Sequence, residues 1–135
     1  MAELHFKDLR DMLSQTEKKY SDEIAFKMKY RNEVVGIKYS KFIEDIKCLG
    51  SYFTTLNLEN KRIGIFSENR YEWNVSYLAT ATSNMVVVPI DKALPENEFL
   101  SLVQRAQVEV LIYDKKHSPL VQKLIESSNS PVKYY

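Results

Sequence analysis

Three short apolar runs, separated by stretches with helical periodicity, constrain the fold of this chain more than any other feature. They occupy residues 63–66 (Ile-Gly-Ile-Phe), 85–90 and 108–113. Short, nearly continuous apolar runs are typical of strands that are buried on both faces of a parallel sheet. Between and after them, apolar residues recur every three or four positions, as on the inner side of a helix. The alternation predicts an α/β fold: an open parallel sheet with helices on both faces.

The residues around these runs complete the predicted architecture. Helical spacing indicates a first helix over about residues 6–18, and alternating apolar residues from Ile24 predict a β-hairpin that turns near Arg31. Ser40 is expected to cap a helix that ends near Leu56, and residues 131–135 are expected to open a fourth strand.

The chain shows no internal repeat and no Gly/Ser-rich linker, so we interpret it as one domain. In this interpretation residues 1–135 form a single domain, with the helix and hairpin in 1–40 and the βαβ units in 41–135.

Composition excludes several classes of function. The chain carries 19 Lys and Arg against 18 Asp and Glu, a net charge of +1, so no nucleic acid partner is expected. No apolar run approaches the roughly 20 residues that cross a bilayer, so no transmembrane segment is expected. One cysteine and no secretory signal favour a cytoplasmic location. With three glycines in all, the chain lacks a glycine-rich loop for binding phosphate.

Ligands of open α/β sheets bind beyond the carboxyl ends of the strands, which directs attention to the polar residues that follow each apolar run. These are Ser67, Glu68 and Asn69 after the first run, Asp91 and Lys92 after the second, and Asp114 and Lys115 after the third. Of these, Glu68, Asn69 and Asp91 are the candidate cofactor-binding residues. Each also has a structural interpretation. Asn69 and Glu72 have the spacing of a capping box at a helix start, while Asp91 and Asp114 are typical of solvated turns.

Other reactive side chains are predicted to be structural. His5 and His117 lack the clustered companions of metal ligands and are interpreted as surface residues, so no metal site and no catalytic residue are predicted. Cys48 is expected to be a small buried hydrophobe. Trp73 and Tyr77, four residues apart, are expected to pack together. A solvated strand face is expected to hold the hairpin cations Lys27, Lys29, Arg31 and Lys38.

Four blocks of sequence, taken in order, resemble one enzyme family. They run from Ile24 to Phe26, from Gly36 to Phe42, from Arg62 to Trp73 and from Val87 to Glu98. Their succession resembles the N-terminal part of the large domain of AMP-forming acyl-CoA synthetases, and the last two blocks look most like long-chain fatty acid–CoA ligases. The resemblance covers almost the whole chain.

The resemblance implies an activity for an intact parent enzyme rather than for this chain. That family uses ATP and Mg²⁺ to convert a carboxylate, here a fatty acid, to an acyl-adenylate, and then transfers the acyl group to CoA. Its phosphate loop and catalytic lid would lie beyond Tyr135, and no position here matches a catalytic residue of the family. The chain alone is therefore expected to be inactive and to need no cofactor, with the remainder of the ligase as its partner. The intact parent is cytoplasmic in this interpretation, with peripheral attachment to a membrane left open.

Two alternatives remain open at this point. A doubly wound sheet of this length is also typical of flavodoxin-like and receiver-like domains, although Ser67 and Glu68 match the phosphate loop of a flavodoxin poorly. The second alternative is an interaction module that self-associates through an open sheet edge between Val132 and Tyr135.

Overall fold

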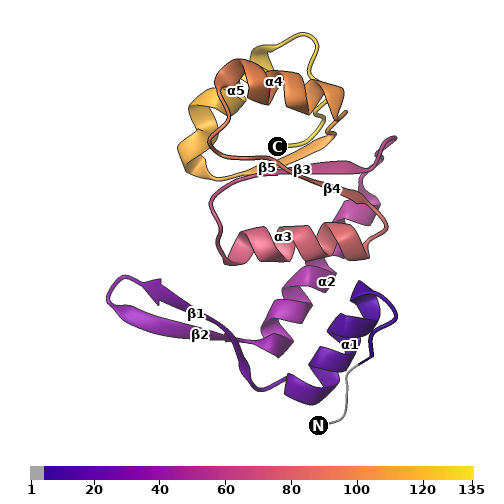
Figure 1. Cartoon of the computed structure of the whole chain (residues 1–135), viewed down its shortest axis with the longest axis vertical. Coiled ribbons are helices and arrows are strands. Elements are labelled where there is room, and N and C mark those ends of the chain that lie inside the picture. The colour runs from indigo at the N-terminus through magenta and orange to yellow at the C-terminus, as the bar shows by residue number, and fades with distance from the viewer. Residues whose placement is uncertain (1–4) are drawn as a thin grey trace.

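The computed structural model describes residues 5–135 and confirms the predicted α/β class (Figure 1). The elements, in chain order, are α1 (Leu9–Tyr20), β1 (Ile24–Tyr30), β2 (Glu33–Lys38), α2 (Tyr39–Thr55), β3 (Arg62–Phe66), α3 (Tyr71–Thr82), β4 (Val86–Pro89), α4 (Glu96–Arg105), β5 (Val110–Tyr113), the 3₁₀ helix η1 (Lys115–His117) and α5 (Ser118–Glu126).

The central sheet is parallel and has the strand order β4-β3-β5, while β1 and β2 form a separate antiparallel hairpin. Figure 1 shows α4 and α5 on one side of the central sheet, and α3 followed by α2 on the other. Helices therefore cover both faces, as the apolar runs predict. The predicted fourth strand is reduced to a single parallel bridge between Val110 and Tyr134.

Side chains of β3 alternate between two hydrophobic cores. Ile63 packs into the core shared with α2 and α3, which includes Phe53 and Val75. Phe66 packs into the core shared with α4 and α5, which includes Phe99 and Val121. Because both faces of β3 are buried, its sequence is apolar at every position after Arg62.

Gly64 is required in the middle of β3 by close packing. A Cβ atom at this position would lie 2.9 Å from Val108 Cγ1 and 3.1 Å from Leu111 Cδ1. Those side chains belong to the core under α4 and α5, so a larger residue would force that core apart.

The second apolar run differs from its prediction. Residues 85–90 were expected to form a strand buried on both faces, but β4 is the edge strand of the sheet and Val86 is 52% exposed. An apolar run does not distinguish a central strand from an edge strand, because the order of strands is set by the crossovers. Pro89, which has no backbone N–H, is tolerated at such an edge.

Both predicted helix caps are wrong. Helix α2 begins at Tyr39 and helix α3 at Tyr71, and neither start has a side-chain cap, so Ser40 and Asn69 do not serve this role. At α2 the backbone supplies the partners, because the N–H groups of Tyr39 and Ser40 donate to Glu23 O and Ser21 O, each at 3.0 Å. At α3, the carboxylate of Glu72 accepts from the guanidinium of Arg70 at 2.7 and 3.1 Å instead of closing a capping box.

The hairpin is attached to the body at its base and extends away from it (Figure 1). The ring of Phe26 meets those of Phe42 and Tyr71 edge-on, at centroid distances of 4.8 and 5.3 Å. Beyond this contact Tyr30 is 65% exposed. The cations of the hairpin are exposed as predicted, and Lys38 pairs with Asp22 at 2.9 Å.

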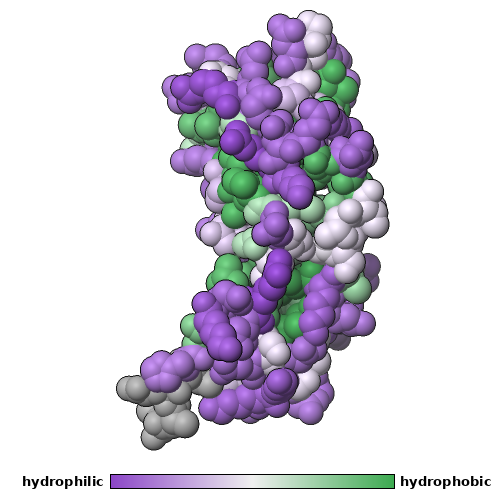
Figure 2. All heavy atoms as spheres, turned by 90° about the vertical axis from the view of Figure 1, so that its right-hand side faces the viewer, coloured by the Kyte–Doolittle hydropathy of each residue, from purple (hydrophilic) through white to green (hydrophobic). Residues whose placement is uncertain are grey.

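Cys48 lies on the exposed side of α2, which corrects the expectation that it is buried. The inner positions of α2 include Ile43, Ile46, Gly50 and Phe53, and position 48 falls between them on the opposite side of the helix. The surface in Figure 2 is predominantly hydrophilic, with scattered apolar patches rather than a continuous apolar band.

Candidate functional site at the carboxyl edge of the sheet

The topology of the sheet creates a crevice between the carboxyl ends of β3 and β5. The chain leaves β3 toward α3 on one face of the sheet, and leaves β5 toward α5 on the other (Figure 1). Where neighbouring strands diverge in this way, open α/β sheets form a ligand-binding crevice. A pocket of about 270 Å³ is present there, and its lining includes Ser67, Arg70 and Trp73 from one strand end and residues 112–115 from the other.

Glu68 lies at the centre of an ion-pair cluster that joins the loops after all three strands. Its carboxylate pairs with Lys116, at 2.7 Å, and with Lys92. Hydrogen bonds from Lys116 and then Lys92 lower the pKa of the Glu68 carboxyl below its ordinary value. The sequence pointed to Glu68 by its place after a strand, but the two lysines come from loops that only the folded sheet brings together.

Asp114 and His117 form a largely buried pair beside Glu68. The Asp114 carboxylate contacts His117 Nδ1 at 2.6 Å and accepts from the backbone N–H of Glu68 at 3.0 Å. Their side chains are 11% and 10% exposed, which corrects the interpretation of both as solvated surface residues. Burial opposes ionisation, but the Glu68 N–H and His117 outweigh it and lower the pKa of Asp114.

The reason that His117 is buried is the turn of η1, which folds it back over the sheet. Its ring lies 4.2 Å from the ring of Phe66, the last residue of β3. An Asp followed three residues later by His, directly after a buried strand, is the signal that sequence reasoning could have used.

The other two candidate residues stand apart from this cluster. Asn69 is exposed, and its side chain makes no hydrogen bond within residues 5–135. The carboxylate of Asp91 accepts from the backbone N–H of Ala93 at 2.9 Å, in agreement with its interpretation as a turn residue. The folded chain therefore gathers Glu68 with Lys92, Lys116 and Asp114, and not with Asn69 or Asp91.

Trp73 packs against a neighbouring side chain and also lines the crevice. Its ring stacks on that of Tyr77 with centroids 5.2 Å apart and an interplanar angle of 18°, as the spacing predicts. The same indole lines the pocket at the end of β3. The crevice thus offers an aromatic wall together with Lys115, a cation without an ion-pair partner in residues 5–135.

The charged side chains at this edge of the sheet can bind a ligand and hold charged groups in position. Glu68, Glu72 and Asp114 are each engaged with a cation or a histidine. Within residues 5–135, no cluster of three or more His, Cys, Asp and Glu side chains has the arrangement of a metal site. No helix in this part of the chain is both long and apolar enough to span a bilayer.

Glu109, which sequence reasoning missed, is the most buried charged residue described and lies at the opposite edge of the sheet. Its side chain is 2% exposed, and its carboxylate accepts from the backbone N–H groups of Glu59, Asn60 and Lys61 at 2.9, 2.7 and 2.8 Å. The ammonium group of Lys133 also pairs with this carboxylate, with Nζ 3.0 Å from Glu109 Oε1. A lone acid inside an apolar run was the available signal. The role is structural, because this carboxylate ties the loop before β3 to β5.

The ion pairs of Glu68 lead to a first testable prediction. In Lys116→Met, the pKa of the Glu68 carboxyl is expected to rise toward its ordinary value, because the largest lowering contribution is removed. Carboxyl-detected NMR titration measures this shift. Lys115→Met removes a neighbouring cation that does not contact Glu68, so an equal rise in that variant would contradict the assignment.

Comparisons with known proteins agree with the fold. The sequence profile of the family described as "AMP-binding enzyme" matches residues 13–134. Long-chain-fatty-acid–CoA ligase 5 of Mus musculus is 31% identical over 93 residues, which are 65% of this chain and 14% of that protein. Fatty acyl-CoA synthetase A of Dictyostelium discoideum is 29% identical over 104 residues, or 76% of this chain and 15% of that protein.

Solved structures share the same arrangement of helices and strands. The N-terminal domain of FACL13 from Mycobacterium tuberculosis superposes with a TM-score of 0.80 at 18% identity, over 96% of this chain and 33% of that one. The chain spans between 8% and 15% of the length of the Mus musculus and Dictyostelium discoideum proteins and of other curated long-chain acyl-CoA ligases and synthetases that it matches. Since the family profile covers nearly all of its residues, the chain belongs to the AMP-binding enzyme family.

Proposed function

We propose that this chain is the N-terminal portion of a long-chain fatty acid–CoA ligase and that it acts as scaffold rather than as catalyst. The observation that carries the proposal is the family match over residues 13–134, combined with relatives that are named as long-chain fatty acid–CoA ligases. In the intact enzyme, fatty acid, ATP and CoA are the substrates, and the parallel sheet of this chain forms a wall of the large domain.

The residues of the crevice do not fit ATP with Mg²⁺. Among the lining residues, Arg70 and Lys115 are balanced by Glu72 and Asp114, whereas a triphosphate needs an excess of cations. The candidate cations next to it, Lys92 and Lys116, are engaged by Glu68. We therefore assign no chemical step to Glu68, Asn69 or Asp91.

A segment exchange tests the long-chain assignment. In the mouse ligase 5, the aligned segment is replaced by this chain, and in a matched control by the equivalent segment of the benzoate CoA ligase of Burkholderia xenovorans. Pyrophosphate release with palmitate is expected to be higher in the first chimera. Higher activity in the benzoate-ligase chimera would contradict the assignment.

The scaffold role is tested on the chain itself. Calorimetric titration with ATP–Mg²⁺, AMP or palmitoyl-CoA is expected to show no saturable heat, and palmitate is expected to give no pyrophosphate. The intact mouse ligase, assayed in parallel, is the positive control. Saturable nucleotide binding or turnover by the chain would refute the scaffold role.

Further experiments on the same chain distinguish the alternative functions. Saturable FMN binding would favour a flavodoxin-like module, and phosphorylation by acetyl phosphate would favour a receiver-like one. Self-association through the sheet edge is supported by exposed Tyr134 and Tyr135, at 38% and 45%. It predicts a dimer that disappears when the chain is shortened to Ser128.

A further inference from the structure

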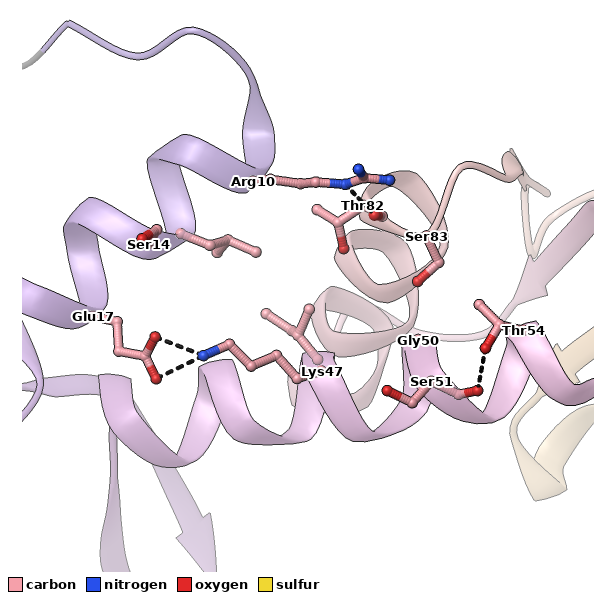
Figure 3. Close-up of a pocket in the computed structure, with 11 residues that line it drawn as sticks. Arg10, Ser14, Glu17, Lys47, Gly50, Ser51, Thr54, Thr82 and Ser83 are labelled. Carbon is pink, nitrogen blue, oxygen red and sulfur yellow. Dashed lines mark hydrogen bonds and ion pairs between the residues drawn. The ribbon is translucent and has the colours of Figure 1, made fainter.

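A cleft next to the N-terminal helix lies away from the carboxyl edge of the sheet. It has a volume of about 470 Å³ and is enclosed by α1, α2 and the C-terminal end of α3 (Figure 3). That volume lies within the range of small-molecule sites. Helix α3 has 12 residues and separates this cleft from the carboxyl-edge cluster by about 18 Å.

The floor of the cleft is apolar. Leu13 of α1 and Ile46 of α2 line it, and their side chains are 8% and 2% exposed. Gly50 lets α2 approach the end of α3 closely, because a Cβ atom there would lie 2.3 Å from Ser83 Oγ. Ser83 lines the wall of the cleft at this point of close approach.

Polar groups without protein partners line the walls. The hydroxyls of Ser14, Ser51 and Ser83 make no hydrogen bond within residues 5–135. By contrast, Thr54 and Thr82 use their hydroxyls on carbonyls of their own helices, at 2.7 and 2.6 Å. Three hydroxyls, from α1, from α2 and from the residue that follows α3, therefore surround one space.

Arg10 supplies the charge that selects a ligand. Its Nε donates to the carbonyl of Thr82 at 2.6 Å, which anchors the guanidinium at the end of α3 and leaves its terminal nitrogens without a partner in residues 5–135. On the other side Lys47 is neutralised by Glu17 at 2.6 Å. Figure 3 shows Arg10 bridging the top of the cleft and the Glu17–Lys47 pair closing the opposite side. Among the lining residues, the net charge is therefore that of Arg10.

We propose that this cleft binds a small organic oxyanion carried on a short apolar chain. The guanidinium would bind a carboxylate or a phosphate ester, since it matches both through paired hydrogen bonds. The serine hydroxyls complete the hydrogen bonding, and Leu13 and Ile46 contact the apolar chain. This site is independent of the scaffold role and of the carboxyl edge.

The test is an amide NMR titration of the chain with hexyl phosphate, hexanoate and neutral hexanol. Saturable shifts are expected at residues 13–14, 46–51 and 82–83 with one or both anions, and the tighter anion identifies whether a phosphate ester or a carboxylate is preferred. Hexanol is expected to bind at least tenfold more weakly. Equal binding of hexanol, shifts centred elsewhere, or no saturable shift would overturn the proposal.

Two variants and a matched control complete the design. Arg10→Gln is expected to weaken anion binding at least tenfold, whereas Arg31→Gln, the same change at the exposed hairpin turn, leaves it unchanged. Ser51→Leu fills the cleft from an exposed helical position and is the second test if Arg10→Gln loses its native circular dichroism spectrum. Unchanged affinity in a folded variant of either kind would overturn the proposal.

Discussion

Glu109→Ala is expected to lower the free energy of unfolding by about 3 kcal/mol, since three backbone N–H groups lose their acceptor at a cost of about 1 kcal/mol each. These donors belong to Glu59, Asn60 and Lys61, and the backbone of Lys61 is held at a left-handed φ of 53° that turns the loop toward the carboxylate. Urea denaturation followed by circular dichroism measures the loss.

Glu59→Ala is the matched control for this prediction. Glu59 also pairs with Lys133, at 3.1 Å, but its side chain is 80% exposed, so its removal is expected to have little effect. A loss in Glu109→Ala no larger than in Glu59→Ala would contradict the structural role of the buried carboxylate.

The same carboxylate predicts a dependence of stability on pH. Burial opposes its ionisation, but Lys133 and the three backbone N–H groups outweigh burial and lower the pKa of Glu109. Because the pKa in the folded state is below that in the unfolded state, its contribution is complete above the unfolded value of about 4.3 and is lost as the pH falls through the folded value. The stability difference between the wild type and Glu109→Gln is therefore expected to shrink below about pH 4.

Phe66→Ala is expected to lower the free energy of unfolding by about 4 kcal/mol, in the range observed when a buried phenylalanine is truncated. Phe66 is fully buried, and its ring lies 4.4 Å from that of Phe99 and 4.2 Å from that of His117. The cavity would open between the sheet, α4 and η1, and it would release His117 from its position next to Asp114. Urea denaturation at low temperature gives the stability, and the NMR signals of the His117 ring report its surroundings.

Phe6→Ala makes the same truncation at a position that is 43% exposed. It is expected to change stability by less than about 1 kcal/mol, because little apolar area is removed from a packed environment. A similar loss in both variants, or an unchanged His117 signal in Phe66→Ala, would contradict the packing described for the end of β3.

Local sequence predicted the elements of this fold well where a pattern extended over several residues. The run at 63–66 and the helical spacing of α2 are long enough to define a buried strand and an amphipathic helix without knowledge of their neighbours. The predictions that failed depended on single residues. Ser40 and Asn69 are good cap formers, but backbone carbonyls from the segment before β1 and the Arg70–Glu72 pair occupy the places where they would act.

The candidate site was predicted only in part, for a related reason. The rule that ligands meet the carboxyl edge of a parallel sheet identified Glu68 and Lys92, but not Lys116. It also gave no sign that the two lysines pair with Glu68, because they are 24 and 48 residues away in sequence. His117 and Cys48 were assigned to the wrong environments because each was judged by its neighbours in sequence.

The sequence by itself determined the α/β class, the parallel pairing and the resemblance to a ligase family, because hydrophobic periodicity and ordered blocks of residues are local properties of the chain. Tertiary structure alone decided that β4 is an edge strand and that the buried carboxylate of Glu109 connects the loop before β3 to β5. It also decided that Arg10 and three serines surround one cleft. These outcomes depend on which elements pack side by side, and burial and charge pairing arise only from that packing.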